Sequence, residues 1–485
     1  MLDEVYNSKV KGKVYRLIYE MNKNSKVRIK TPVGTTDTKH TGPILSQGSV
    51  EAAILSSNNI GNGTREAFVD EDKEVEYVEN IKLAPLSFLD DLARLSIDRD
   101  STQYGNDKVE DLLNRKGLEL NLDKSNFLIM GSKKSRKKLQ NQVDQNPLIL
   151  NNQNMKQVKT LKYLGDFISS NLSELVHDTV VKRIPIAKMA IYEIRAVMED
   201  RRAKCLGGIN VGLMIWESTK VLILHYNSCS WLNISRKTIK MLNNLYNQWF
   251  CCLFCIGAGS PSANFFWQAG VKNPENVILE SKMNFYFHLK NLPPKSLGKE
   301  VIDVQESNPN IPSLIQELEE HLRNLNLDPM KTSKRVWKRK VKQYILNKTR
   351  EDLLLMMRKY KKIDYDMVSK ESFERKKYFH ELDLESVRMR LRISSGMVVG
   401  IKGNFKEKYR KSNRSITCPS CNNNSNNSRP NDDVEKPPDT QSHLLDECEA
   451  FKELRNSLDL ETDSGIVSFF KEVVRRRTSI DDDDE

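Results

Sequence analysis

The spacing of apolar positions changes several times along the first hundred residues, which predicts short helices mixed with strands. Residues 2–19 have helical spacing, and residues 26–30 alternate polar and apolar side chains, as a strand does, before a turn at Gly34. Residues 50–59 are small and apolar enough to form a buried helix. Residues 81–96 are apolar on both sides of two neighbouring aspartates, so a β-hairpin with acids at its tip is expected there.

The pattern becomes helical further along the chain. A helix is expected at 108–115, two short strands within 118–130, and a basic, Asn- and Gln-rich loop over 131–160. Beyond Tyr163-Leu164-Gly165, apolar positions three and four residues apart predict a helical region from about 175 to 325. These elements together predict an α+β fold.

Length and charge narrow the class of protein. The chain has 485 residues, enough for about three domains. Its formal net charge of +12 favours an anionic partner, with RNA and DNA as the leading candidates. No apolar run approaches the ~18 residues of a membrane span, so no membrane partner is expected. Eight cysteines are too few for a disulfide scaffold, and residues 1–4 lack a secretory signal, so we expect an intracellular protein, cytoplasmic, nuclear or both.

Asp90 and Asp91 stand between the apolar stretches of the predicted hairpin. Paired carboxylates suit Mg²⁺, a hard cation that prefers oxygen ligands and leaves positions open for phosphate oxygens. Two such ions about 4 Å apart stabilise the attacking and leaving oxygens in nucleotidyl transfer. Taken alone, most Asp-Asp pairs are turn or helix-cap residues, and this plainer interpretation stays open.

Four segments, in one order, resemble the palm of reverse transcriptases from non-LTR retrotransposons. Gln47-Gly48, within GPILSQGSVEAAILS, resembles the family's template-and-nucleotide segment, and FLDD at 88–91 resembles its metal-binding motif. In KGLELNLDKSNFLIMGSKK, Lys124 matches a lysine near the incoming triphosphate. Tyr163-Leu164-Gly165 resembles the primer-grip turn that precedes the thumb.

The resemblance implies an RNA-directed DNA polymerase, that is, a reverse transcriptase, over about residues 5–250, with Mg²⁺ as cofactor. The implied catalytic residues are Asp90, Asp91 and Lys124, and the implied nucleotide or nucleic-acid contacts are Gln47, Gly48 and Tyr163. Without the resemblance, Lys124 is a solvated loop lysine, Tyr163 a core aromatic and Gly48 a turn glycine. These alternatives stay open.

The family pattern also requires a third carboxylate, on a strand upstream of the Gln-Gly segment. The 46 residues before Gln47 offer only Asp3, Glu4, Glu20 and Asp37, none of them in a strand-like apolar setting. We therefore expect the family's fingers, the first part of its palm and its endonuclease domain to be missing. Two aspartates without a third ligand bind a metal pair weakly, so the chain alone is expected to be inactive as a polymerase.

A cysteine and histidine pattern lies near the C-terminus, where Cys418-Pro-Ser-Cys421 is followed after 21 residues by His443 and then, after four more, by Cys448. Three thiolates and one imidazole suit a tetrahedral structural Zn²⁺. The pattern also resembles the C-terminal cysteine-histidine motif of non-LTR elements. The alternative is a pair of free thiols beside an Asn-rich loop. The remaining cysteines lack a histidine at ligand spacing and are expected to be core thiols.

Residues 331–414 carry 26 basic and 10 acidic residues. Trp337, Val341 and Ile345 fall on one helical stripe with cations around it. A positive helix binds a phosphate backbone with steep salt dependence and no sequence preference, and Trp337 could stack on unpaired bases. The alternative, a solvated surface helix with its tryptophan in the core, stays open. The candidate nucleic-acid contacts here are Lys334, Arg335, Trp337, Lys338, Arg339 and Lys340.

The expected architecture is α+β: a partial right-hand polymerase palm, a helical thumb, a helical basic region and a small zinc-binding module. The expected bounds are 1–170 for the partial palm, 171–325 for the thumb and connector, 326–414 for the basic region, 415–460 for the zinc module and 461–485 for a tail. Two functions are consistent with this organisation. One is a reverse transcriptase domain-containing protein of retrotransposon origin, and the other is a non-enzymatic protein that binds nucleic acid through the basic region and the zinc module.

Overall fold

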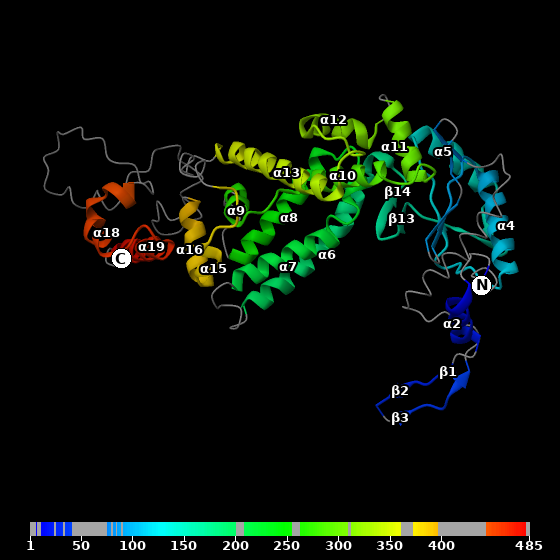
Figure 1. Ribbon diagram of the computed structural model, residues 1–485, viewed down its shortest axis with the longest axis horizontal. Helices are drawn as coiled ribbons and strands as arrows, with labels where there is room; N and C mark the ends of the chain where they lie inside the picture. The colour runs from blue at the N-terminus through cyan, green and yellow to red at the C-terminus, as the bar shows by residue number, and fades with distance from the viewer. Residues whose placement is uncertain are drawn as a thin grey trace. The chain divides into compact units, whose positions relative to one another are not determined.

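The computed structural model divides the chain into two compact units, which we describe separately (Figure 1). Unit 1 comprises Met1–Tyr163 and Phe167–Leu175, and unit 2 comprises Leu164–Asp166 and Val176–Glu485. The residues that the structure describes are 6, 11–23, 26–32, 34–40, 75–78, 81–83, 85–88, 91–199, 208–254, 262–308, 312–359, 372–395 and 443–481. Five candidate site residues lie outside them: Gln47, Gly48, Asp90, Cys418 and Cys421.

The first helix of unit 1 whose bounds are described is α2, Gly12–Lys23, where a helix was predicted over 2–19. Two short antiparallel ladders follow, one of β1 (Lys26–Val27) with β4 (Lys39–His40) and one of β2 (Lys30–Thr31) with β3 (Gly34–Thr35). The strand predicted over 26–30 is therefore split in two. The buried helix predicted over 50–59 lies outside the described residues.

Two β-hairpins come next in the chain. β5 (Val75–Val78) pairs with β6 (Ile81–Leu83), and β7 (Leu86–Phe88) pairs with β8 (Asp91–Ala93). In the second hairpin Phe88 pairs with Asp91, and residues 89 and 90 lie outside the described residues. The hairpin predicted around the two aspartates is confirmed, and Asp91 is the first residue of its returning strand.

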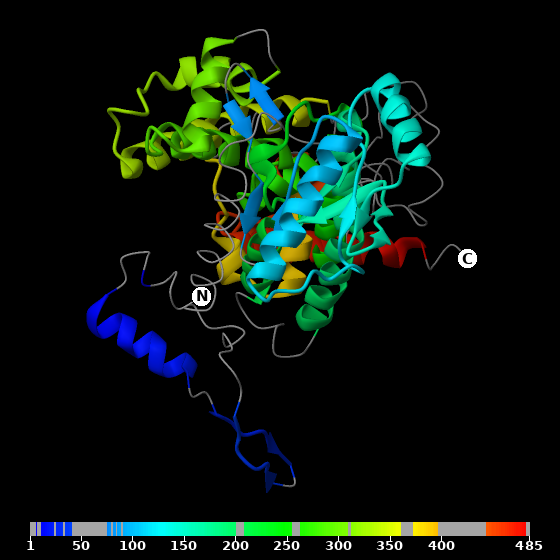
Figure 2. The same cartoon turned by 90° about the vertical axis from the view of Figure 1, so that its right-hand side faces the viewer.

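Helix α4, Arg99–Arg115, begins well before the helix predicted at 108–115. Asp98 caps it, since the Asp98 carboxylate accepts a hydrogen bond from the Ser101 amide at 2.7 Å. The first half of α4 is polar, so its residues carry no apolar periodicity that would have extended the prediction. The helix packs against β10 and α5, the next elements of unit 1 (Figure 2).

The loop predicted over 131–160 is wrong. This segment contains helix α5, Lys133–Gln145, and the short strands β10 (Ile149–Leu150), β11 (Gln153–Asn154) and β12 (Lys156–Gln157). Ser132 caps α5, because its hydroxyl accepts a hydrogen bond from the Ser135 amide at 3.2 Å. Lys, Arg and Gln favour helix, so α5 forms without a broad apolar stripe.

Short strand pairs complete unit 1. Of the two strands predicted within 118–130 only β9, Asn126–Phe127, forms, and it pairs in parallel with β12. β13 (Thr160–Tyr163) and β14 (Asp166–Ser169) make a hairpin. Its two turn residues, Leu164 and Gly165, have φ angles of +48° and +81°. Positive φ at both positions matches the right-handed twist of the flanking strands.

Unit 2 is helical over the described part of 175–325, as predicted. Its helices here are α6 (Leu175–Glu199), α7 (Gly208–Ile223), α8 (Arg236–Phe254), α9 (Ser262–Ala269), α10 (Pro274–Lys290), α11 (Leu297–Ser307) and α12 (Leu314–Leu325). A stacked pair of buried indoles, Trp216 of α7 and Trp249 of α8, has ring centroids 4.5 Å apart. Burial of such large rings stabilises the helix packing.

The C-terminal part of unit 2 contains α13 (Lys334–Met357), α15 (Tyr378–Glu381), α16 (Leu384–Ser394), a π-helical turn at His443–Glu447, α18 (Lys452–Ser457) and α19 (Asp463–Asp481). Residues 461–485 were expected to be a tail, but α19 packs against α16. Val467, Phe469, Phe470 and Val473 of α19 are buried in a core with Leu444 and Phe451. The acidic residues at the end of the chain obscured this apolar pattern.

Candidate nucleic-acid interface

Helix α13 presents one buried side and one charged side. Ser333 caps it by accepting a hydrogen bond from the Val336 amide at 3.4 Å. Every fourth residue from Trp337 to Met357 is buried: Trp337, Val341, Ile345, Thr349, Leu353 and Met357. The first three pack with Phe287 of α10 and Leu318 of α12 in one apolar core. This stripe fixes the rotation of the helix, so the side opposite the stripe faces outward.

The structure assigns Trp337 to the core and contradicts base stacking by its ring. Trp337 is fully buried, and its ring centroid lies 5.0 Å from that of Phe287 and 6.3 Å from that of Tyr286. Tyr344, the other aromatic residue in the first half of α13, is half-buried. Its hydroxyl forms a hydrogen bond with His321 Nδ1 at 2.9 Å. The alternative in which the tryptophan belongs to the core is therefore correct.

The outward side of the first half of α13 is positively charged. We call this the α13 cation face; its exposed residues are Lys334, Arg335, Lys338, Arg339, Lys340 and Lys342. No acidic residue lies in the first turn of the helix, and none of the described carboxylates forms an ion pair with a member of this face. Lys334 and Lys338, and Arg335 and Arg339, are four residues apart, so they repel each other.

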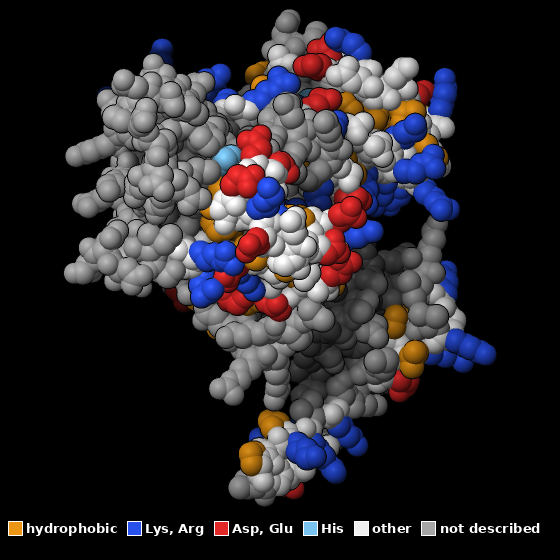
Figure 3. All heavy atoms as spheres, turned by 90° about the vertical axis from the view of Figure 1, so that its left-hand side faces the viewer, with side chains coloured by type: hydrophobic (Ala, Val, Ile, Leu, Met, Phe, Trp, Pro, Cys, Tyr) orange, Lys and Arg blue, Asp and Glu red, His pale blue; other side chains and the backbone are white. Residues whose placement is uncertain are grey.

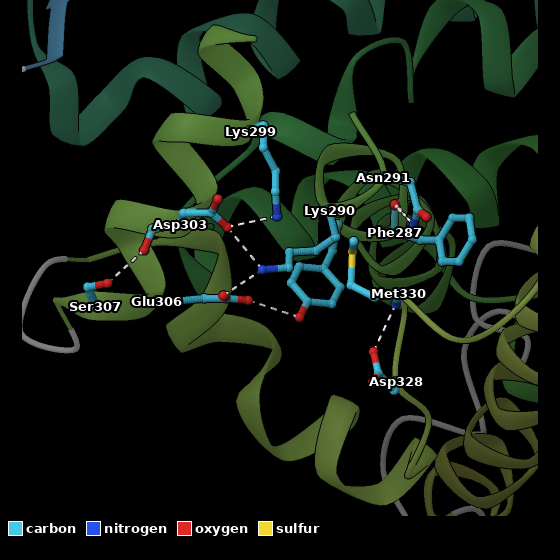
Figure 4. Close-up of polar contacts among 10 residues, drawn as sticks. Phe287, Lys290, Asn291, Lys299, Asp303, Glu306, Ser307, Asp328 and Met330 are labelled. Atoms are coloured by element: carbon cyan, nitrogen blue, oxygen red, sulfur yellow. Dashed lines mark hydrogen bonds and ion pairs between the residues drawn. The ribbon is translucent and has the colours of Figure 1, made fainter. Parts of the chain in front are cut away.

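Several other basic side chains of unit 2 do form ion pairs with carboxylates. Lys290 of α10 binds Asp303 at 3.0 Å and Glu306 at 2.7 Å, while Lys299 binds the same Asp303 (Figure 4). Arg390 of α16 binds Asp463 of α19 at 2.6 Å. The face drawn in Figure 3 likewise carries Asp and Glu side chains among its Lys and Arg side chains. Mutual pairing of this kind leaves little net field for a ligand.

Two arginines of α16, Arg388 and Arg390, add little to the positive surface. Arg388 forms an ion pair with Glu385 at 2.6 Å, and its side chain is only 12% exposed. Arg390 is similarly enclosed and lies over the ring of Tyr378. Both cations serve the packing of α16 within unit 2.

Asp91 of the acidic hairpin acts electrostatically on Tyr163 within unit 1. Asp91 is exposed on β8, and Tyr163 ends β13. Burial raises the pKa of the Tyr163 hydroxyl, and the negative charge of Asp91 raises it further. The charge of Asp91 thus acts on Tyr163, although the two residues are 72 positions apart in the chain.

Lys124 is an exposed residue of a turn, and its amide donates a hydrogen bond to Asn121 Oδ1 at 3.2 Å. A cavity of about 210 Å³ adjoins this turn and is lined by Leu122, Asp123, Ser125, Gln153, Asn154, Met155 and Lys156. Lys124 does not line it. The plainer interpretation of Lys124 as a solvated lysine agrees with this placement.

A buried arginine that no sequence pattern singled out holds the turn at Leu164–Asp166. Within unit 2, Arg183 Nη2 donates to the Gly165 carbonyl at 3.1 Å and binds Asp166 Oδ1 at 2.8 Å. Tyr226 donates its hydroxyl proton to the Leu164 carbonyl at 2.9 Å. Burial lowers the pKa of the Arg183 guanidinium, which Asp166 partly offsets. The segment around Arg183 is helical and apolar, so no spacing rule singles it out.

Two of the four proposed zinc ligands are described, and they share one π-helical turn. The amide of Cys448 donates to the carbonyl of His443 at 2.7 Å, which is the five-residue hydrogen bond of a π-helix. Such a bond stacks residues five apart, so His443 and Cys448 lie on one side of the turn. His443 is 5% and Cys448 0% exposed. Among the described residues no group of three metal-ligating side chains occurs, since Cys418 and Cys421 are not included.

The other described cysteines, Cys229, Cys251 and Cys252, are half-buried. Burial raises the pKa of the Cys229 and Cys251 thiols, which disfavours the reactive thiolate. This agrees with their expected role as packed thiols. Cys205 and Cys255 lie outside the described residues.

Comparison with known proteins adds no family assignment. No family model matches the chain, and no curated protein does. Within the described ranges, none of the helices has the length and apolar character needed to cross a membrane.

Proposed function

We propose that this protein binds nucleic acid, with the α13 cation face as a contact surface for the phosphate backbone. One observation carries the proposal: the exposed cations on one side of α13 have no acid partner among the described residues. Unpaired like charges on one helix repel each other, and a polyanion would relieve that repulsion. Release of condensed counterions from the nucleic acid would supply the driving force.

The burial of Trp337 removes base stacking at this position from the expected mode of binding. Without an exposed tryptophan on α13, the face offers charge and hydrogen-bond donors but no stacking platform at that position. Contacts of this type position a protein on the phosphates and carry no sequence information. We therefore expect RNA and DNA of unrelated sequence to bind with similar affinity.

The test is equilibrium binding of labelled RNA and duplex DNA at low salt. The α13 variant replaces Lys334, Arg335, Lys338 and Arg339 by Gln. A matched control replaces four exposed cations that already face carboxylates: Arg323, Lys331, Lys452 and Arg476. Both variants lose four charges. We expect at least a tenfold loss of affinity in the α13 variant and less than a threefold loss in the control; equal losses would contradict the proposal.

A second candidate function is nucleotidyl transfer of the reverse transcriptase type, with Mg²⁺ on Asp90 and Asp91. The electrostatic effect of Asp91 on the Tyr163 hydroxyl supports it, because both residues belong to motifs that resemble one polymerase centre. Gln47, Gly48 and Lys124 would contact the nucleotide. We expect little or no synthesis by this chain alone, since two neighbouring carboxylates fix a metal pair poorly. Primer extension on an RNA template, with Asp90→Ala plus Asp91→Ala as the comparison, tests this candidate.

We also propose a structural Zn²⁺ on Cys418, Cys421, His443 and Cys448. The shared π-helical turn and the burial of His443 and Cys448 support it, because structural zinc ligands are preorganised and shielded from water. Arg455 donates to the carbonyls of Leu444 and Cys448, at 3.1 and 2.6 Å, and so braces this turn. Metal analysis of the purified protein should find one zinc per chain; a metal-free protein whose melting temperature a chelator leaves unchanged would contradict the assignment.

A further inference from the structure

We propose that helix α5 of unit 1 is a second, separate contact surface for nucleic-acid phosphates. The surface, which we call the α5 cation face, consists of Lys133, Lys134, Arg136, Lys137 and Lys138. This inference takes one thing from the proposed function, namely that the partner is a nucleic acid. Its evidence comes from a different helix, in the other unit, whose residues were not among the candidate contacts named from the sequence.

The positions of the charged residues in α5 destabilise the isolated helix. The positive end of a helix dipole lies at its N-terminus, where carboxylates stabilise and cations destabilise. Here the cations occupy the N-terminal half, and the first turn has no acidic residue. The one acid of the helix, Asp144, lies at the opposite end, where it accepts a hydrogen bond from Gln140 at 2.9 Å. Both ends of α5 therefore carry the unfavourable sign.

Nothing in the described part of unit 1 neutralises these cations. None of the five forms an ion pair with a described carboxylate, and four of them, the lysines, are exposed. Lys133 and Lys137, and Lys134 and Lys138, are four residues apart and repel each other. Arg136 makes one long contact, 3.5 Å to Ser170 Oγ, and its Nε is buried without a hydrogen-bond partner. An external anion would relieve the repulsion among the four exposed lysines.

The chemistry of α5 favours a nucleic acid over an anionic membrane. A helix that lies in a bilayer surface needs a broad exposed apolar side. The apolar residues of α5 are Leu139 and Val143, and both are half-buried in unit 1. The exposed side instead offers Lys, Ser, Asn and Gln, which donate hydrogen bonds to phosphate and sugar oxygens.

The length of the α5 cation face determines how strongly binding should depend on salt. Lys133 to Lys138 span about 7.5 Å along the helix axis. Phosphates of one strand follow each other about every 3.4 Å along a duplex. The face can therefore neutralise two or three phosphates, which corresponds to a slope of about −2 in a plot of log Kobs against log salt concentration.

The experiment compares salt slopes of the full chain on one RNA and one duplex DNA. The α5 variant carries Lys133→Gln, Lys134→Gln, Lys137→Gln and Lys138→Gln, and it is measured beside the α13 variant and the combined variant. We expect each four-residue variant to have a shallower slope than the unchanged protein, by about 2 for α5, and the combined variant to show the sum. Far-UV circular dichroism and the melting temperature check that α5 still folds, and we expect a melting temperature equal to or higher than that of the unchanged protein.

The outcomes separate this inference from the proposed function. If the α5 variant keeps the full slope while the α13 variant loses part of it, the α5 inference is overturned and the proposed function stands. If the unchanged protein binds neither nucleic acid, both are overturned. Vesicles with 30% phosphatidylserine serve as the alternative partner; binding to them that depends on the α5 lysines, together with an unaltered nucleic-acid slope, would also overturn the inference. As an independent readout, bound RNA should protect Lys133, Lys134, Lys137 and Lys138 from acetylation by an amine-reactive ester.

Discussion

Arg183 and Asp166 form an ion pair of 2.8 Å in which the arginine side chain is 4% and the aspartate side chain 20% exposed. Arg183 also donates to the Tyr226 carbonyl at 2.6 Å and lies over the rings of Tyr226 and Trp231. One guanidinium thus joins helix α6 to the turn at Leu164–Asp166. Loss of this side chain would leave the Asp166 carboxylate with the Asn227 amide donor at 2.7 Å but without its cation, and would remove the guanidinium donor from the carbonyls of Gly165 and Tyr226.

We predict that Arg183→Ala destabilises the protein by about 3 kcal/mol, because removing one partner of a buried pair leaves an uncompensated charge. The measurement is urea unfolding followed by tryptophan fluorescence. Asp166→Asn combined with Arg183→Ala should recover part of the loss, since the carboxylate charge is then gone. A loss below 1 kcal/mol in the single variant would show that the pair does not fix the turn.

Gly165→Ala should lower the free energy of unfolding more than Gly117→Ala does. Gly117→Ala serves as the matched control. Both glycines have positive φ, +81° and +64°, so alanine strains the backbone at both. A Cβ at Gly165 would lie 3.1 Å from the ring of Tyr226, whereas one at Gly117 meets nothing within 4 Å. We predict a loss of about 1 kcal/mol for Gly117→Ala from strain alone and a larger loss for Gly165→Ala. Equal changes in unfolding free energy would contradict the contact with Tyr226.

The burial of Trp337 leads to a prediction that separates packing from binding. Trp337→Ala should destabilise the protein by about 3–5 kcal/mol, because it empties a large site in the core. Trp337→Phe, which keeps most of the core filled, should retain its affinity for single-stranded RNA within twofold. A base-stacking role would instead cost about 1–3 kcal/mol of binding in the folded phenylalanine variant. Anisotropy with a single-stranded oligonucleotide measures the difference.

Protonation of His321 should lower the free energy of unfolding in mild acid. Burial lowers its pKa below 6.5, and the charge of Lys348 lowers it further, against smaller opposing effects of Glu320 and Asp352. The unfolded chain therefore takes up a proton on His321 first as the pH falls. The contribution of this group is complete above about pH 6.5 and declines as the pH falls toward the folded-state pKa.

The measurement for His321 is the unfolding free energy between pH 7.5 and 5. We expect His321→Gln to lose less stability over this interval than the unchanged protein does. Tyr344→Phe serves as a control, because it removes the hydroxyl 2.9 Å from His321 Nδ1 and keeps the titratable imidazole. Parallel pH profiles for the unchanged protein and His321→Gln would contradict the assignment.

The elements that the sequence predicted are those with strong local signals. Apolar residues around two aspartates define the hairpin that contains Asp91, and the stripe beginning at Trp337 defines α13. Helix α5 was missed because its residues favour helix through their propensity and the Ser132 cap, without apolar periodicity. Local pattern therefore identifies a helix best where one of its sides is buried.

The candidate site was predictable in part. The cations of α13 can be read directly from the sequence. Whether they form ion pairs depends on which carboxylates the fold brings near them, and no local sequence rule predicts these carboxylates. Arg390 has its partner 73 positions away, in Asp463, whereas Lys338 has none among the described residues. Arg183 likewise acts on a turn 18 positions earlier and on a carbonyl 43 positions later.

The salt dependence of binding tests the central claim most directly. In a plot of log Kobs against log potassium chloride concentration for a duplex DNA, we predict that the variant lacking Lys334, Arg335, Lys338 and Arg339 has a slope shallower by about 3 than the unchanged protein. The control variant that lacks four paired cations should keep the original slope. An α13 variant with the full slope and full affinity would contradict the account.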